Sequence, residues 1–125
     1  MIIGIGTDIA RVARFERAMG RHGERFSRRL LGEWELERFR DHVLPAAFLA
    51  KRFAAKEAFV KALGTGLRHG MRWVDIQVVN DAQGRPSLVL TGKAQKLAEA
   101  AGVRSLHLSL SDEDALAVAF VILEG

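Results

Sequence analysis

The sequence predicts an α+β protein in which one long central helix packs on a mostly antiparallel sheet. Three observations support this fold class. Helical patterns dominate the first half of the chain, strand patterns dominate the second half, and the two do not alternate as they would in a doubly wound fold. The 125 residues, 49% of them hydrophobic, are enough for one core, and no repeat or linker divides them. We therefore expect a single domain over residues 1–125.

The chain should open with a short strand and an amphipathic helix. Residues 2–8 alternate glycine with β-branched residues, which is typical of a buried strand, and Asp8 would emerge at its end. From residue 10 to about residue 19, apolar residues recur at helical spacing opposite a row of arginines. Asp8 is also in place to cap the N-terminus of that helix.

Two more helices are expected before the middle of the chain. Residues 33–42 have the pattern of a short helix. Pro45 suits the first turn of a long helix that runs to about Leu63, because its ring presets the backbone and its missing N–H is not needed there. Gly64 ends this helix, and residues 64–66 (Gly-Thr-Gly) are small enough for the backbone to approach a ligand.

The second half is expected to hold four strands, one helix and two polar turns. In chain order these are a strand over 73–79, a turn over 80–86, a returning strand over 87–90, a helix over 93–101, a strand over 105–110, a turn over 112–114 and a strand over 115–123. Because short turns join the strands of each pair, the pairing should be antiparallel.

Arginines are concentrated near the N-terminus. The chain has 19 Lys and Arg against 15 Asp and Glu, for a net charge of +4. Five arginines follow one another at steps of three or four residues, which would align them on one side of a helix, or of a helix interrupted at Gly20 or Gly23. They are Arg14, Arg17, Arg21, Arg25 and Arg28. This basic ridge is either a solvated helix face or a surface for nucleic acid, anionic lipid or an acidic protein.

The composition excludes several function classes. With no cysteine, the chain can form neither a disulfide nor a cysteine-ligated zinc or iron–sulfur site. The four histidines lack metal-binding spacing, and no Walker A or Gly-x-Ser-x-Gly motif is present. No apolar run approaches the ~20 residues that cross a bilayer, and no secretory signal opens the chain. We expect a cytoplasmic protein that does not associate with membranes.

One carboxylate of the long helix stands out. At about 100° per residue, Glu57 falls in the same stripe as the apolar Leu49, Phe53 and Val60. A carboxylate on an apolar face needs a cation, a metal or several hydrogen bonds, because burying it unpaired costs several kcal/mol. Lys61, one turn later, can supply the cation. The alternative is an ordinary exposed Glu57–Lys61 pair.

A strand end and a helix face each supply one carboxylate to a candidate metal site. Mg²⁺ usually takes one or two carboxylates from a protein and completes its shell with waters and substrate phosphates. Asp8 and Glu57 therefore predict a magnesium and phosphate site, unless Asp8 is only a helix cap. His107 shares a strand face with Ser109 and Ser111, so it is either a hydrogen-bonded structural residue or part of a phosphate site.

Four sequence blocks occur in an order and spacing that are highly specific. They are residues 4–9 (Gly-Ile-Gly-Thr-Asp-Ile), residues 52–66 (Arg-Phe-Ala-Ala-Lys-Glu-Ala-Phe, Val60, then Lys-Ala-Leu-Gly-Thr-Gly), residues 80–86 (Asn-Asp-Ala-Gln-Gly-Arg-Pro) and residues 107–110 (His-Leu-Ser-Leu). Together they resemble the holo-[acyl-carrier-protein] synthases, the short bacterial members of the 4′-phosphopantetheinyl transferase superfamily. The resemblance covers nearly the whole chain and implies the fold of that superfamily.

The resemblance implies a reaction and a metal site. Enzymes of this family move the 4′-phosphopantetheine arm of coenzyme A to a serine of apo acyl carrier protein, release adenosine 3′,5′-bisphosphate and serve fatty acid biosynthesis. Asp8 and Glu57 would bind Mg²⁺, and Lys61 would neutralise phosphate charge beside them. The base that takes the serine proton would be Glu57, directly or through a water on the metal, or else Asp8.

The resemblance also implies how coenzyme A is held. Two glycine-containing turns would approach the nucleotide, while an arginine and a histidine would lie near its phosphates. The residues concerned are Arg52, Gly64, Thr65, Gly66, Gly84, Pro86 and His107. One departure is visible, because many relatives carry Ser-His where this chain has Ser111 and Asp112, so no role of that histidine is carried over.

Two kinds of partner follow from the family. Acyl carrier proteins are acidic and helical, and the family docks them on its first helix, where Arg14 and Arg21 match its basic positions and Arg25 extends the ridge. Such charge complementarity mainly raises the association rate and should weaken with salt. The family is also a homotrimer with sites between subunits.

Two other classes of protein compete with this interpretation. A basic nucleic-acid-binding module would use the arginine ridge on a phosphate backbone, but the chain has no tyrosine and few aromatic residues for stacking on bases. It would also leave Glu57 without a role. A non-catalytic structural subunit would use Asp8 as a cap and Glu57 as the partner of Lys61, and would tolerate Glu57→Gln.

Overall fold

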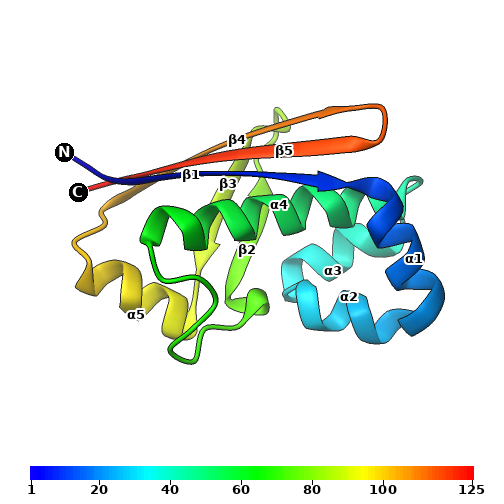
Figure 1. Ribbon diagram of the computed structural model, residues 1–125, viewed down its shortest axis with the longest axis horizontal. Helices are drawn as coiled ribbons and strands as arrows, with labels where there is room; N and C mark the ends of the chain where they lie inside the picture. Colours follow the sequence, from blue (N-terminus) through cyan, green and yellow to red (C-terminus); the bar gives the residue numbers. More distant parts are fainter.

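The computed structural model describes all 125 residues and confirms the predicted α+β class. The helices are α1 (Val12–His22), α2 (Glu24–Leu30), α3 (Glu33–Arg40), α4 (Pro45–Leu63) and α5 (Gly92–Ala100), with a 3₁₀ turn η1 (Trp73–Asp75). The strands are β1 (Ile2–Arg11), β2 (Ile76–Asn80), β3 (Pro86–Leu90), β4 (Ser105–Glu113) and β5 (Leu116–Glu124). Figure 1 shows α4 running along one face of the sheet formed by β1, β5 and β4, with α1, α2 and α3 gathered at one end.

All strand pairing is antiparallel, as predicted, but the strands form two sheets. One has the order β1-β5-β4, and the other is the β2–β3 hairpin. Both chain termini lie at the same end of the larger sheet (Figure 1), where the Gly125 N–H donates to the Met1 carbonyl oxygen at 2.9 Å. No helix of the structure is both long and apolar enough to span a bilayer.

The long helix α4 has the predicted bounds. Pro45 occupies its first turn, and Gly64 ends it with φ of 83°, a left-handed conformation that glycine adopts without strain. Its buried surface is rich in alanine, including Ala54, Ala55 and Ala58, all fully buried. Small side chains let the helix approach the sheet closely.

The glycines of β1 make this approach closer still. A Cβ atom on Gly6 would collide with the Ala58 carbonyl oxygen, and one on Gly4 would collide with the Ala62 carbonyl oxygen. The backbone of β1 therefore lies directly on α4, which only glycine permits. Asp8 follows Gly6 by two residues on the same strand face, so its side chain is also brought to α4.

The strand β1 is longer than predicted, and the capping interpretation of Asp8 is wrong. Asp8 lies inside the β1–β5 ladder opposite Ala119, and β1 continues to Arg11. The residue before α1 is Arg11, whose side chain makes no capping hydrogen bond. The pairing with β5 extends the strand past the acid because the ladder satisfies backbone groups on both strands.

The other boundaries differ by a few residues. Residues Trp73–Asp75 form the η1 turn instead of starting a strand. Asp112 and Glu113 belong to β4, so the tight turn of the β4–β5 hairpin is confined to Asp114 and Ala115. The arginine-rich helix is interrupted at Gly23, one of the two predicted positions, where φ of 55° separates α1 from α2. The ridge therefore bends at this corner.

A buried ion pair joins the helical end of the molecule to α4. The Lys56 ammonium lies 2.7 Å from Glu35 Oε1, and both side chains are fully buried. Lys56 also donates to the carbonyl oxygens of Leu30 and Trp73. Burial lowers the pKa of Lys56, and the charge of Glu35 opposes that shift. Every donor of this ammonium has an acceptor, so the charge is compensated inside the core.

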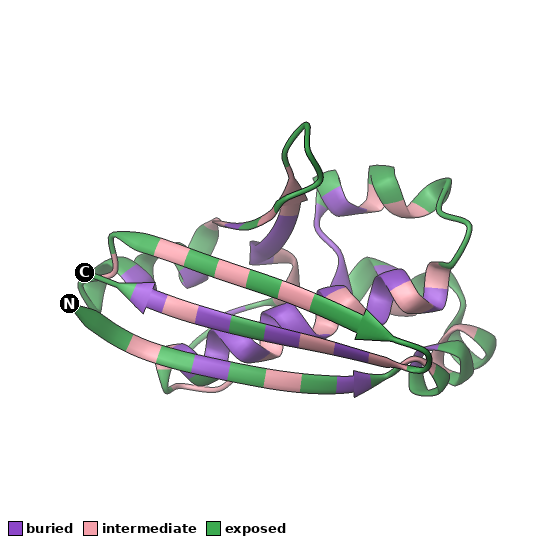
Figure 2. Ribbon diagram, turned by 90° about the horizontal axis from the view of Figure 1, so that it is seen from above, coloured by how far each residue is buried: buried purple, intermediate pink, exposed green.

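The outer face of the larger sheet is open. Figure 2 looks onto this face, and no helix covers it. It carries apolar side chains from neighbouring strands, among them Ile5 and Ile9 of β1, which are 60% and 61% exposed, and Phe120 of β5, which is 42% exposed. Ile5 lies opposite Ile122, and Phe120 lies between Thr7 and Ser109. An apolar sheet face of this kind marks an interaction surface.

Candidate active site

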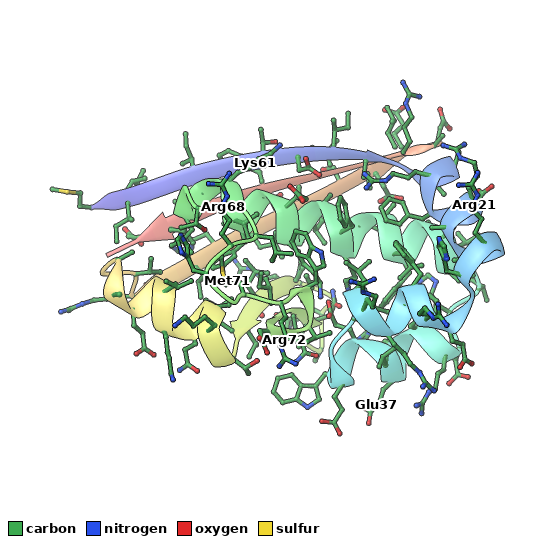
Figure 3. All side chains as sticks on the ribbon, turned by 60° about the horizontal axis from the view of Figure 1, so that its bottom comes forward. Arg21, Glu37, Lys61, Arg68, Met71 and Arg72 are labelled. Atoms are coloured by element: carbon green, nitrogen blue, oxygen red, sulfur yellow. The ribbon has the colours of Figure 1, made fainter.

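Strand β1 and helix α4 bring two of the predicted catalytic residues together. The Lys61 ammonium lies 3.0 Å from Asp8 Oδ1 and also donates to the Thr7 carbonyl oxygen at 3.1 Å. Asp8 is largely covered, with 15% of its side chain exposed, whereas 52% of the Lys61 side chain is exposed. Figure 3 labels Lys61 where the C-terminal half of α4 meets β1. The cation is therefore open to a ligand on its outer side.

Glu57 belongs to the same cluster. Partial burial raises the pKa of its carboxyl, and the negative charge of Asp8 raises it further, while Lys61 and Arg14 oppose the shift. The alternative of a simple Glu57–Lys61 ion pair is wrong, because Lys61 pairs with Asp8. Glu57 is thus a half-buried carboxylate beside a second carboxylate, with no ion-pair partner of its own within 4 Å.

The donor set of this cluster fits a magnesium ion. Asp8 and Glu57 are near enough for the charge of one to act on the other, and no group of three or more His, Cys, Asp or Glu side chains occurs that could enclose a metal alone. Mg²⁺ prefers this situation, since it keeps positions for waters and substrate phosphates. Burial and then the repulsion by Asp8 raise the pKa of Glu57, and a bound cation would relieve that repulsion.

The basic ridge begins next to the cluster. The Arg14 guanidinium stacks over the ring of Phe53 at 4.8 Å, and Phe53 lies one turn before Glu57 on α4. Arg21 stands exposed at the far end of α1 (Figure 3), and Arg25 lies beyond the corner, on α2. Of the three predicted docking arginines, Arg14 therefore lies nearest Glu57, and Arg21 and Arg25 are exposed on either side of the α1–α2 corner.

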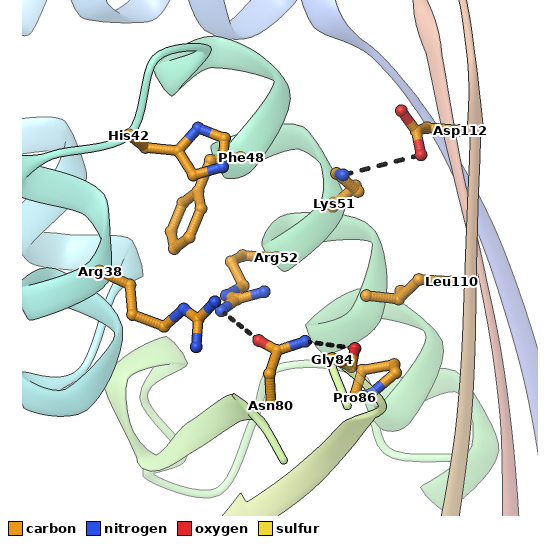
Figure 4. Close-up of a pocket in the computed structure, with 10 residues that line it drawn as sticks. All are labelled: Arg38, His42, Phe48, Lys51, Arg52, Asn80, Gly84, Pro86, Leu110 and Asp112. Carbon is orange, nitrogen blue, oxygen red and sulfur yellow. Dashed lines mark hydrogen bonds and ion pairs between the residues drawn. The ribbon is translucent and has the colours of Figure 1, made fainter. Parts of the chain in front are cut away.

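A polar cavity of about 280 Å³ opens on the other side of α4. Three of the predicted nucleotide-binding residues line it, namely Arg52, Gly84 and Pro86. The rest of its lining comes from α3, the 41–44 segment, α4, β2 and β4, and comprises Arg38, His42, Phe48, Lys51, Asn80, Leu110 and Asp112. Figure 4 shows the guanidinium groups of Arg38 and Arg52 close together at this cavity, and the Lys51 ammonium directed to Asp112. Three cationic side chains, Arg38, Lys51 and Arg52, face a single carboxylate, that of Asp112, so the lining favours an anion.

Arg52 is held firmly at the wall of the cavity. Its Nη2 donates to Asn80 Oδ1 at 3.2 Å, its Nε lies 3.4 Å from Glu35 Oε2, and its guanidinium stacks on the Phe48 ring at 4.3 Å. Burial lowers the pKa of Arg52 to about 10, so it remains charged near neutral pH. The Asn80 side chain in turn donates to the Gly84 carbonyl oxygen at 3.0 Å (Figure 4).

The remaining predicted residues fall into two places. Gly64, Thr65 and Gly66 follow α4 directly and lie within five residues of Lys61 in the chain, with φ of 83° at Gly64 and 66° at Gly66. His107 lies on β4, where its ring nitrogen is 3.0 Å from Glu124 Oε1. It lines a second cavity of about 320 Å³ that shares the Pro86 wall with the first.

The predicted residues thus form two groups on opposite flanks of α4. Glu57 and Lys61 face β1, which is one edge strand of the larger sheet. Lys51 lies 3.6 Å from Asp112 of β4, which is the other edge strand. The carboxylate cluster and the cavity are therefore separated by the width of the sheet within one chain.

Several residues of these sites had no predicted role. Arg38, His42 and Lys51 come from segments that are separate in sequence, and only packing brings them to the cavity. Glu35 and Lys56 were also missed. A signal existed for Lys56, because it lies among the alanines of α4, where a lysine must be buried.

The two groups define the class of protein. Phosphoryl transfer requires positioning and charge neutralisation more than covalent chemistry by the protein, and carboxylates for a metal, a nearby ammonium and a basic cavity supply both. The fold and the site therefore indicate an enzyme that transfers a phosphate-linked group.

Comparisons with known proteins make this class specific. The family model of the 4′-phosphopantetheinyl transferase superfamily matches residues 4–121. The holo-[acyl-carrier-protein] synthase of Halorhodospira halophila is 58% identical over 123 residues, which cover 98% of each chain. The crystal structure of the holo-[acyl-carrier-protein] synthase of Neisseria meningitidis matches all of both chains with a TM-score of 0.93 and 43% identity. That of Bacillus anthracis in complex with CoA (3′,5′-ADP) covers 98% of this chain and 96% of its own, with a TM-score of 0.81 and 36% identity.

This chain belongs to the holo-[acyl-carrier-protein] synthases of the 4′-phosphopantetheinyl transferase superfamily. The resemblance carried by the four sequence blocks is thereby confirmed, as is the expected fold. The relatives are enzymes and lend no support to the nucleic-acid-binding alternative.

Proposed function

We propose that the protein transfers the 4′-phosphopantetheine group from coenzyme A to a serine hydroxyl of apo acyl carrier protein and releases adenosine 3′,5′-bisphosphate, in a Mg²⁺-dependent reaction. The cluster of Asp8, Glu57 and Lys61 is the observation that carries this proposal. Such a reaction belongs to fatty acid biosynthesis in the cytoplasm, where carrier proteins are loaded.

The reaction breaks the phosphoanhydride bond of coenzyme A and forms a phosphate ester with the serine. The serine Oγ attacks the β-phosphorus of coenzyme A, the bond from that phosphorus to the bridging oxygen breaks, and the oxygen leaves on adenosine 3′,5′-bisphosphate. Mg²⁺ held by Asp8 and Glu57 would neutralise charge on the diphosphate. Lys61 adds a second positive charge from its exposed side.

The serine proton needs an acceptor at the same place. Burial and the charge of Asp8 raise the pKa of Glu57 in the metal-free protein, and a bound cation would oppose this shift, so the assignment of a base depends on the position of the carboxylate and not on its basicity. Glu57 also lies one turn after Phe53, over which Arg14 of the basic ridge stacks. A serine delivered along the ridge would therefore arrive beside Glu57, and we assign it as the base, with Asp8 as the alternative.

The basic cavity is the proposed site for the nucleotide part of coenzyme A. Arg52 is fixed there with its charge retained, and Gly84 and Pro86 form a wall without bulky side chains. His107 lies on the far side of Pro86, within reach of the same ligand. Residues Gly64–Gly66 would approach the coenzyme from the other group, beside Lys61.

We infer that three copies of the chain assemble and complete the site. The carboxylate cluster lies at the β1 edge of the sheet and the cavity at the β4 edge, so one coenzyme would have to bridge the sheet within a single chain. In a ring of three sheets packed through their open apolar faces, the β1 edge of one subunit adjoins the β4 edge of the next. Both halves then meet at each boundary between subunits.

Co-expression of two impaired variants tests this shared site. Asp8→Asn disables the carboxylate half and Arg52→Ala disables the cavity half. If the halves come from neighbouring subunits, mixed trimers contain some boundaries with both halves intact, and activity returns. Activity no higher than the sum of the two separate variants would show that each chain builds its own site.

The acidic carrier is proposed to dock on the basic ridge. Arg14, Arg21 and Arg25 are all exposed, and they lead from the α1–α2 corner to the catalytic cluster. An acidic helix lying on this surface would gain electrostatic steering, which raises the association rate more than the final affinity.

Intact-protein mass spectrometry of an apo acyl carrier protein tests the function itself. Incubation with this protein, coenzyme A and Mg²⁺ should add the mass of one phosphopantetheine arm, and a chelator should prevent the gain. Glu57→Gln should abolish the gain in a folded protein, whereas Glu99→Gln, a matched change at an exposed position of α5, should not. Modification by Glu57→Gln at the wild-type rate would remove the catalytic assignment.

A further inference from the structure

The buried carboxylate of Glu35 serves more than the ion pair with Lys56. Its Oε1 accepts from the Gly32 N–H at 2.9 Å and from the Lys56 ammonium at 2.7 Å. Its Oε2 accepts from the Val78 N–H at 3.0 Å and lies 3.4 Å from Arg52 Nε. Glu35 therefore connects the start of α3, the middle of α4 and strand β2. Its Oε2 atom also forms the ion pair with Arg52 of the basic cavity.

Arg52 is fixed on three sides by these surroundings. Glu35 faces Nε as an ion pair at 3.4 Å without a hydrogen bond, Asn80 accepts from Nη2, and the ring of Phe48 covers one face of the guanidinium. Figure 4 shows the guanidinium of Arg52 beside Asn80, with that of Arg38 next to it. A guanidinium fixed in this way presents its remaining N–H groups in one direction, as the recognition of a phosphate requires.

The charges around Glu35 explain why this oxygen matters. Lys56 and Arg52 are both buried cations, and Glu35 is the acid that pairs with each of them. Arg38 adds a further positive charge near Arg52. Without Glu35, the positive charges of Lys56 and Arg38 would repel Arg52 with no opposing charge. This repulsion would favour a conformation in which the Arg52 side chain turns toward solvent.

We propose that Glu35 is a positioning residue for coenzyme A binding, which holds the Arg52 guanidinium in the orientation that receives a phosphate of the nucleotide. This role rests on the proposed function of the cavity. Lys56 balances the charge of Glu35 inside the core and does not itself reach the cavity, because its three donors are directed to Leu30, Glu35 and Trp73.

Calorimetric titration of the full-length protein with adenosine 3′,5′-bisphosphate tests the proposal. Arg52→Ala should weaken binding at least about tenfold, as expected for the loss of a hydrogen bond to a charged group. Glu35→Gln should weaken it by a similar factor. In the Arg52→Ala background, Glu35→Gln should have no further effect on Kd, because the two residues act through one contact.

A second variant covers the case in which Glu35→Gln alone fails to fold. The double change Glu35→Gln with Lys56→Met removes both charges together and leaves no unpaired ammonium in the core. It should fold and still bind the nucleotide about tenfold more weakly. Leu97→Ala, a truncation on α5, which lines neither cavity, is the control for stability, since it should lower Tm and leave Kd unchanged.

The outcomes separate this inference from the function on which it rests. If the wild-type protein does not bind adenosine 3′,5′-bisphosphate, the cavity is not the nucleotide site and both ideas fail. If the wild-type protein binds it, Arg52→Ala weakens binding and the double variant retains the wild-type Kd, then only the positioning role of Glu35 is overturned. An effect of Glu35→Gln that persists undiminished without Arg52 would overturn it as well.

Discussion

The contact between β1 and α4 makes Gly6→Ala the sharpest test of how this fold builds its site. A Cβ atom at position 6 would collide with the Ala58 carbonyl oxygen and would lie 2.7 Å from the Ala62 nitrogen. Ordinary contacts of a Cβ atom begin near 3.4 Å. Strand or helix must therefore move by at least about 0.7 Å, the difference between these two distances. Both partners are backbone, so no side chain can swing aside.

The expected cost concerns stability and activity together. Overpacking of a core costs about 1–3 kcal/mol, and a backbone contact places Gly6→Ala near the upper value. About 3 kcal/mol corresponds to roughly 10 °C in Tm for a domain of this size. Asp8 lies two residues further on the same face of β1 and moves with it. Because a misplacement of about 1 Å at a catalytic group can cost 10²-fold, kcat should fall by up to that factor.

A matched glycine provides the control. Gly20 lies in α1, and a Cβ atom there would have no neighbour within 4 Å, so Gly20→Ala should stabilise the helix by about 0.5–1 kcal/mol. Urea unfolding at one protein concentration and the rate of carrier modification would be measured for both variants. A Gly6→Ala protein as stable and as active as Gly20→Ala would refute the close β1–α4 contact and its role in placing Asp8.

Three further predictions concern charge and assembly. Because burial and the charge of Asp8 raise the pKa of Glu57, the folded metal-free protein keeps a proton there at pH values where the unfolded chain has lost it. The resulting stability is complete below pH 4.5, the ordinary pKa of a glutamate, and is lost as the pH rises through the raised pKa. Urea unfolding of the wild type at a series of pH values should show this loss, and Glu57→Gln should remove it. The same pH profile in both proteins would contradict the assignment. Replacement of Arg14 and Arg21 by glutamate should raise KM for the carrier protein at least about tenfold, and the increase of KM with salt concentration should become smaller. A KM equal to that of the wild type would exclude the ridge as the docking surface. Replacement of Ile5 and Phe120 by lysine should produce folded monomers in sedimentation experiments, with activity lost because the shared site is divided; trimers that persist would place the interface elsewhere.

Local sequence signals predicted the long helix and its catalytic carboxylate. Pro45 and Gly64 act on their own backbone angles, so the ends of α4 needed no tertiary information. Glu57 was recognisable because a carboxylate in an apolar stripe is anomalous at helical spacing alone. The four sequence blocks likewise sufficed to identify the family, since their order and spacing are properties of the chain.

Tertiary packing decided the rest of the site. The sequence offered only Glu57 as the partner of Lys61, and it left Asp8 as either a helix cap or a metal ligand. The ladder with β5 places Asp8 inside a strand, against a lysine that is 53 residues away. The same holds for the contact of Arg52 with Asn80, 28 residues apart, and for Lys56 with Glu35, 21 residues apart.

The physical reason lies in the range of each interaction. Backbone preferences and side-chain periodicity act over one or two turns, so the sequence alone determines helices, strands, caps and the residues that are chemically out of place. The distance between two elements depends on how closely their surfaces pack, and here that distance is determined by Gly4 and Gly6 against the alanines of α4. Only the folded structure therefore decides which charges become neighbours.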